Sequence, residues 1–155
     1  MPPLCVVGQT GDLKIAKLLI DSGADVNAWK EKPLFAAATK GHLELVKLLL
    51  ASGANPDALK PDSWTALHTS MVTYHPEIAE ILVNAGADVN ATSITGATPL
   101  MIAVDRGYAE LVTMLLTKGA KTDPVNPEGF TALKMALADG QAAIAKELIK
   151  AGAKK

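Results

Sequence analysis

The chain has 155 residues, about one domain's worth, and its 15 basic and 16 acidic side chains give a formal net charge of −1. Without a basic face or tail, neither nucleic acid nor an anionic membrane surface is expected as a partner.

Apolar residues make up 49% of the chain, too many for disorder. No apolar run approaches the roughly 20 residues of a membrane span. The single cysteine, Cys5, excludes an internal disulfide and predicts a reducing compartment, the cytoplasm or nucleus. The first charged residue is Asp12, so no signal peptide is expected either.

A repeat of constant length organises the chain. Gly-Ala pairs recur at Gly23, Gly53, Gly86, Gly119 and Gly152, with equal intervals from Gly53 onward and a slightly shorter first interval. A leucine recurs in step with them, at Leu4, Leu34, Leu67, Leu100 and Leu133. We therefore predict one domain, 1–155, of five repeats with boundaries near 1–24, 25–57, 58–90, 91–123 and 124–155. The first repeat lacks its leading loop, and the loop of the second is three residues short.

Each repeat predicts two short helices followed by a polar loop. Thr98 and Pro99, just before a marker leucine, are a good N-cap and a good first helical residue. A glycine such as Gly41 then predicts the end of the first helix. The second helix begins at once, and residues 43–50 place their apolar side chains on one face. After the Gly-Ala pair come turn-forming residues such as 127–129, which lead into the next repeat.

Three sequence motifs resemble those of the ankyrin repeat family, and the resemblance covers the whole chain. The stretch 23–28 reads Gly-Ala-Asp-Val-Asn-Ala and recurs at 86–91, and 41–46 matches the opening of the family's second helix. Residues 65–68 and 98–101 are close variants of its Thr-Pro-Leu-His box. The resemblance implies an all-α solenoid of helix–turn–helix units joined by β-turn or hairpin loops, a curved slab with a concave groove. Stacking lets each repeat cover the apolar face of its neighbour.

No catalytic or metal-binding constellation is predicted, so we expect no enzyme activity, no metal and no cofactor. His42 and His75 occupy the same position of adjacent repeats, about 10 Å apart, which is too far to share a zinc ion. His68 falls in the family's structural histidine position, and Cys5 replaces that histidine in the first repeat. Phosphate-binding glycine loops, nucleophile elbows and Cys-x-x-Cys motifs are all lacking from the sequence.

Binding residues are expected where the repeats vary, at the loop tips and at the end of the first helix. We predict a partner-binding surface made of Trp29, Trp64, Val72, Thr73, Ile94, Ala97, Asp105, Arg106 and Phe130. Trp64 and Phe130 share one tip position two repeats apart, which predicts two rings roughly 20 Å apart beside a shallow notch. The alternative is that these rings fold back on their own loops. An apolar centre with a charged rim is typical of a protein interface.

These observations favour a non-enzymatic scaffold that binds a protein partner. One alternative is a regulatory or targeting segment of a larger multidomain protein, and the others are an enzyme or a designed array. Designed consensus repeats would be alike, yet Leu48, Ile81, Met114 and Glu147 share one position. We expect a monomer, unless the apolar N-terminal edge associates with a second copy.

Four local predictions follow from departures within the repeat. Tyr74 replaces the turn glycine found in the other repeats, so we expect a locally rebuilt turn rather than a left-handed tyrosine. The first repeat should have a frayed, self-associating or interrupted apolar edge, and the last should be a polar cap carrying Glu147. Asn27 and Asn90 should brace the loops. The alternative for these two is asparagine hydroxylation, which the resemblance to some animal ankyrin repeats suggests.

Overall fold

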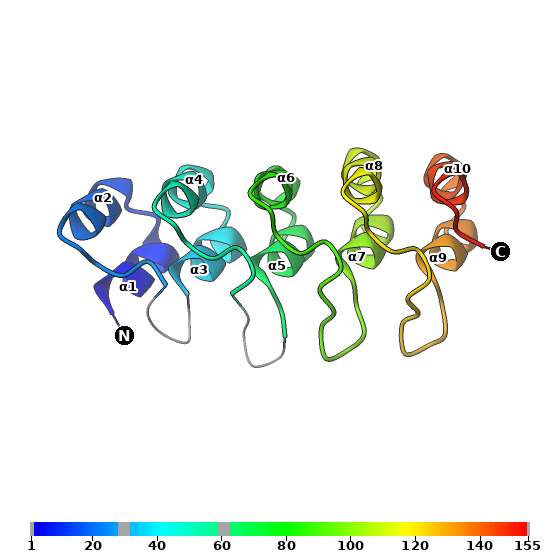
Figure 1. The fold of residues 1–155 in the computed structure, drawn as a ribbon, viewed down its shortest axis with the longest axis horizontal. Coiled ribbons are helices and arrows are strands. Elements are labelled where there is room, and N and C mark those ends of the chain that lie inside the picture. The colour runs from blue at the N-terminus through cyan, green and yellow to red at the C-terminus, as the bar shows by residue number, and fades with distance from the viewer. Residues whose placement is uncertain (1, 28–31, 59–62, 155) are drawn as a thin grey trace. The chain divides into compact units, whose positions relative to one another are not determined.

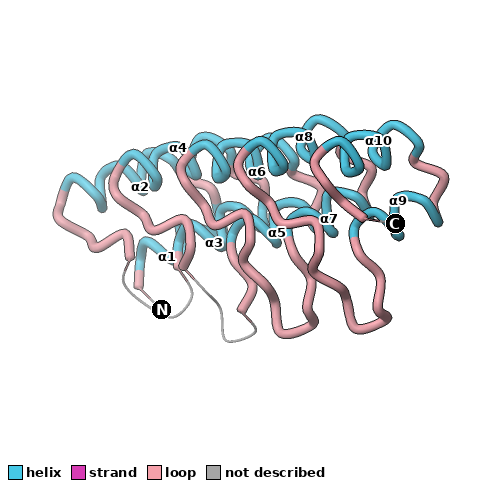
Figure 2. The backbone as a smooth tube through the Cα atoms, turned by 45° about the vertical axis from the view of Figure 1, so that its right-hand side comes forward, coloured by secondary structure: helices cyan, strands magenta, loops and turns pink. Residues whose placement is uncertain are grey.

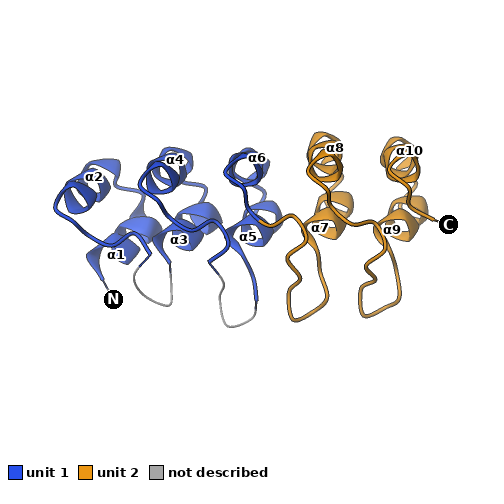
Figure 3. Cartoon of the chain, viewed as in Figure 1, with its two compact units in different colours: residues 1–87 blue, residues 88–155 orange. Residues whose placement is uncertain are grey.

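The computed structural model describes residues 2–27, 32–58 and 63–154, and within these ranges the chain is all helical with no strand. Ten helices follow one another in five pairs, in the order shown in Figure 1. The backbone divides into two compact units, Met1–Ala87 and Asp88–Lys155, drawn in different colours in Figure 3. The prediction of an all-α fold built from helix pairs is therefore confirmed.

The first unit contains three helix pairs. They are α1 (Pro3–Thr10) with α2 (Leu13–Asp21), α3 (Pro33–Lys40) with α4 (Leu43–Ala51), and α5 (Ala66–Val72) with α6 (Pro76–Asn84). The first helices of the pairs, α1, α3 and α5, pack on one another in one row, and α2, α4 and α6 form a second row above them (Figure 1). Each pair therefore contributes one helix to each layer and is covered by the adjacent pair.

The second unit repeats this arrangement with two pairs. They are α7 (Pro99–Asp105) with α8 (Ala109–Thr117), and α9 (Ala132–Ala138) with α10 (Ala142–Lys150). Helix α7 packs on α9 and α8 packs on α10, so the two-row order is kept. Long loops precede α7 and α9 and project from the helical layers, as the tube in Figure 2 shows.

The sequence signals for helix ends act as expected. The side chains of Thr65, Thr98 and Thr131 each accept a hydrogen bond from a backbone N–H in the first turn of the following helix. These caps satisfy donors that a helix N-terminus would otherwise leave unpaired. Gly11 and Gly41 end α1 and α3 at φ values of 77° and 76°. In that left-handed region glycine has no Cβ to clash, so the chain can reverse at once into the second helix.

The marker leucines form the centre of each pair. Leu4, Leu34, Leu67, Leu100 and Leu133 are all buried, with at most 3% of their surface exposed. A matching series in the second helices, Leu49, Leu82, Leu115 and Leu148, is fully buried. The repeat length of the sequence is therefore the interval at which core side chains recur.

Two asparagines tie one repeat's loop to the next repeat. Asn27 Nδ2 donates to Gly53 O at 2.9 Å, and Asn27 Oδ1 accepts from Asn55 N at 2.8 Å. Asn90 does the same in the second unit, to Gly119 O at 3.1 Å and from Lys121 N at 2.8 Å. The structural role predicted for both side chains is confirmed, because each satisfies a donor and an acceptor of the neighbouring loop.

The prediction of a rebuilt turn at Tyr74 is wrong. Tyr74 has a φ of 65°, in the left-handed region, where the corresponding Gly107 has a φ of 69°. The hydrogen bond that closes the turn is also kept, from His75 N to Ser70 O at 2.7 Å, as from Tyr108 N to Ala103 O at 2.9 Å. The packed helices fix the turn, and the tyrosine is accommodated there because the residue lies at the surface and is 66% exposed.

The first and last repeats differ at their outer edges, and the prediction for these edges is confirmed in part. In the first repeat Val6, Ile15 and Leu18 are exposed, so the apolar N-terminal edge is real. At the other edge Lys134 is exposed where Phe35, His68 and Met101 are buried in the preceding repeats. Leu137 is nevertheless 51% exposed there, so the last repeat is a mixed rather than a purely polar cap. Fraying of residues 1–10 stays a prediction.

Replacing Tyr74 with glycine should stabilise the protein. The substitution relieves a left-handed residue, worth roughly 1–2 kcal/mol, and loses about 0.4–1 kcal/mol through the greater freedom of glycine in the unfolded chain. We expect a net gain of about 1 kcal/mol in the free energy of unfolding, measured by urea denaturation. Gly107→Ala is the matched control and should lose about 1 kcal/mol, because its Cβ would meet open space and only the backbone is strained. A less stable Tyr74→Gly variant would show that the turn carries no strain.

Asn90→Ala should destabilise the second unit by about 2 kcal/mol, because it leaves Gly119 O and Lys121 N without their partner. Thermal or urea denaturation measures the effect. Asn84→Ala on the exposed end of α6 is the control and should change stability by less than about 0.5 kcal/mol. Equal effects of the two substitutions would contradict the bridging role of Asn90.

Candidate functional site

Two loops of the second unit form hydrogen-bonded turns that lie beside each other. Ser93 N donates to Ala97 O at 3.0 Å, and one repeat further on Asn126 N donates to Phe130 O, also at 3.0 Å. Side chains close the same turns, with Ala97 N donating to Ser93 Oγ at 3.2 Å and Phe130 N to Asn126 Oδ1 at 2.9 Å. Since their polar groups are paired internally, both loops are built to hold one shape.

These two loops carry solvent-exposed apolar side chains. Ile94, Val125 and Phe130 are 72%, 55% and 41% exposed, respectively. A Cβ on Gly96 of the first loop would lie 3.6 Å from Pro127 Cδ of the second, so the loops are in van der Waals reach. Val125 was missed by the sequence analysis, because the corresponding residue one repeat earlier is the polar Thr92. Its position in a polar loop was the signal that could have identified it.

The other predicted residues of this unit lie in two places. Ala97 is half-buried at the end of its loop, close in sequence to Ile94. Asp105 and Arg106 lie at the opposite end of α7, where their side chains approach to 3.6 Å. Helix α7 has 7 residues and therefore spans about 10 Å. The charged pair is thus separated from the loop residues by the length of the helix, as expected of a rim rather than a centre.

In the first unit Trp64 lies just before α5, and Val72 and Thr73 lie at its end. Trp64 is half-buried, and its ring lies against the ring of the buried His68, with centroids 5.6 Å apart and planes tilted by 54°. This contact favours the alternative that the Trp64 ring packs on its own repeat. Thr73 Oγ1 donates to Thr69 O at 2.8 Å, so its hydroxyl is bonded within the helix. Trp29 lies outside the described residues.

The predicted binding residues are divided between the two compact units. Ile94, Ala97 and Phe130 share the paired loops, whereas Trp64, Val72 and Thr73 belong to the other compact unit. The notch between Trp64 and Phe130 therefore remains a prediction.

The histidines have structural surroundings. His68 is fully buried, and its Nδ1 accepts from Thr65 N at 3.3 Å and lies 2.8 Å from Thr65 Oγ1, which completes the cap of α5. His42 Nε2 lies 3.2 Å from Gln9 O of the preceding repeat, and Gln141 Nε2 donates to Val104 O at 2.9 Å from the same position of the last repeat. This position thus covers the turn of the repeat before it.

Metal-binding clusters and membrane-spanning helices are both missing from residues 2–27, 32–58 and 63–154. No group of three or more His, Cys, Asp or Glu side chains in those ranges could hold a metal ion. No helix in them is long and apolar enough to cross a lipid bilayer.

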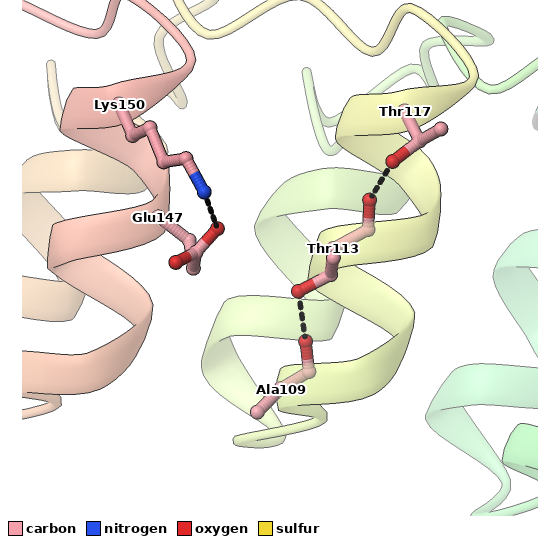
Figure 4. A network of polar contacts seen from close by, with 5 residues as sticks. All are labelled: Ala109, Thr113, Thr117, Glu147 and Lys150. Carbon is pink, nitrogen blue, oxygen red and sulfur yellow. Dashed lines mark hydrogen bonds and ion pairs between the residues drawn. The ribbon is translucent and has the colours of Figure 1, made fainter.

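A shallow depression lies between α8 and α10. It has a volume of about 300 Å³ and is lined by Thr113, Leu116, Thr117, Glu147, Lys150 and Ala151. As Figure 4 shows, the two threonine hydroxyls donate to carbonyls of their own helix, at 3.1 and 2.8 Å, and Lys150 faces Glu147 at 3.8 Å. Each threonine hydroxyl is bonded within α8 and Lys150 pairs with Glu147, so these side chains form no aligned nucleophile and base.

The stacked helix pairs, the paired loops and the asparagine bridges define a repeat protein. The family model for ankyrin repeats matches residues 4–93 and 90–155, and the chain belongs to the ankyrin repeat family. Ankyrin repeats are generally protein–protein interaction modules, and the family is typically non-enzymatic. A comparison with curated proteins gives no match.

Proposed function

We propose that this protein is a non-enzymatic scaffold that binds a protein partner, with the paired loops of the second unit as the centre of its binding surface. The observation that carries the proposal is the exposure of Ile94, Val125 and Phe130 on loops whose backbones are hydrogen-bonded internally. A rigid loop loses little conformational freedom on binding, and exposed apolar side chains gain most from leaving water.

The rim of the surface is polar. Glu128 lies at the tip of one loop, and Asp105 and Arg106 lie at the far end of α7. An apolar centre with charged edges is typical of a protein interface, whereas small-molecule sites are concave and mostly apolar. Trp64, Val72 and Thr73 belong to the first unit, and each stays a proposed partner contact by itself.

The second candidate is a regulatory or targeting segment that contacts other domains of a larger protein. The same loop residues would serve that role, and a longer reading frame would distinguish it. Cys5, a buried cysteine outside any disulfide, supports an intracellular location for either role, in the cytoplasm or nucleus.

Phe130→Ala should weaken partner binding by about 2 kcal/mol or more, as loss of a central aromatic anchor does. Its effect on folding should be small, because the ring is on the loop surface. The partner is first isolated on immobilised wild-type protein from extracts of the producing cells and identified by mass spectrometry, and its affinity for purified variants is then measured by calorimetry.

Glu77→Ala, on the exposed face of α6, is the matched control and should leave the affinity unchanged. Trp64→Ala should also weaken binding, but it is interpreted only with a melting curve, since the ring packs on His68. A partner that binds Phe130→Ala normally and loses affinity for Glu77→Ala would place the interface on the second helices instead.

A further inference from the structure

The exposed apolar edge of the first repeat is the same surface that later repeats use for packing. Ile15 is 48% exposed, but the corresponding Leu45 and Ile78 in the next two repeats are each 2% exposed. Ile144, in the last repeat, is 5% exposed although no repeat follows it in this structure. This position is therefore covered by the preceding repeat, and Ile15 on α2, with no repeat before it among the described residues, stays half-exposed.

The edge is contiguous across both helices of the first repeat. Leu18, one turn after Ile15 on α2, is 66% exposed, and Val6 on α1 is 42% exposed. The positions that correspond to Val6 in the next two repeats, Ala36 and Thr69, are buried. In Figure 1, α1 and α2 lie one above the other at the end of the first unit, so this edge presents two helices side by side.

The charged residues on either side of Leu18 are of opposite sign, so two copies related by a two-fold axis can pair them. Lys14 lies four residues before Leu18 and Asp21 three residues after it, and both are exposed, so they flank it on neighbouring turns of one helix face. When two α2 helices pack antiparallel about Leu18, Lys14 of each copy meets Asp21 of the other. Such opposite charges at the rim fix the register and orientation of an interface.

Head-to-tail stacking of copies is less favourable. The last repeat exposes Lys134 at the position where Phe35, His68 and Met101 are buried in the preceding repeats. Stacking would cover this lysine with the apolar edge of α1 and α2, at the cost of removing an unpaired charge from water. A symmetric contact between like edges avoids that cost and closes at two copies.

We propose that a second copy of this chain covers the edge formed by Val6, Ile15 and Leu18, in a two-fold dimer with antiparallel α2 helices. This inference does not depend on the proposed partner site, because the paired loops belong to the other unit. The dimer contact is small and its apolar side chains are partly exposed already, so association is weak and depends on concentration.

Sedimentation velocity of the full chain over a wide concentration range tests the proposal. The wild type should pass from monomer to dimer and no further. Leu18→Lys should raise the dissociation constant about 30-fold or more, since the residue occurs twice at the centre of the contact. Ile94→Lys, which places the same charge on an exposed isoleucine of the loops, is the matched control and should leave dimerisation unchanged.

A charge swap tests the antiparallel register. Lys14→Asp and Asp21→Lys should each weaken the dimer about tenfold or more by opposing like charges, and the double variant should restore it. Lys17→Asp makes the same charge change one residue from Leu18, on a different face of α2, and should have little effect. Circular dichroism confirms that each variant is folded.

Three results would overturn the proposal. One is a wild type that stays monomeric at every concentration. Another is assembly beyond two copies, which indicates head-to-tail stacking. The third is a dimer that Leu18→Lys leaves intact or that the double charge variant fails to restore.

Discussion

The structure depends on the fact that one helix pair cannot bury its own apolar face. A pair such as α3 and α4 has apolar side chains on both of the sides that face neighbouring pairs. Only an adjacent pair can remove these side chains from water. Within the first unit, Ile15 is half-exposed and the corresponding Leu45 is buried, although both are large aliphatic residues of second helices. Burial is thus set by the presence of a neighbouring repeat, and the edges of the series are its least protected parts.

The same constraint separates structural residues from residues free to vary. Caps such as Thr98, turn glycines such as Gly41 and bridging asparagines such as Asn90 all serve contacts between helices or repeats. Ile94 and Phe130 are exposed on their loops, so these side chains can be chosen for binding without loss of the core. This division places the proposed partner surface on the loops.

The regular spacing of the marker residues made the helix pairs and their buried leucines predictable, because the packing contacts recur at the repeat length of the sequence. Prediction from the sequence failed where packing against neighbouring helices overrides the backbone preference of a single residue. Tyr74 keeps the left-handed turn of a glycine because the two packed helices dictate the path between them. The contact of Trp64 with His68 and the exposure of Val125 depend on loop conformation, which a repeat pattern does not encode.

The central claim is that each repeat is stabilised by its neighbours more than by its own helices. Native-state hydrogen exchange of the amides of Leu19 and Leu49 tests it directly, since the two residues occupy the same position of α2 and α4 in adjacent repeats. In dilute monomeric protein, the account predicts much faster exchange at Leu19, through opening of the edge repeat alone. Equal protection of the two amides would contradict it, because each helix pair would then be stable without a neighbour on both sides.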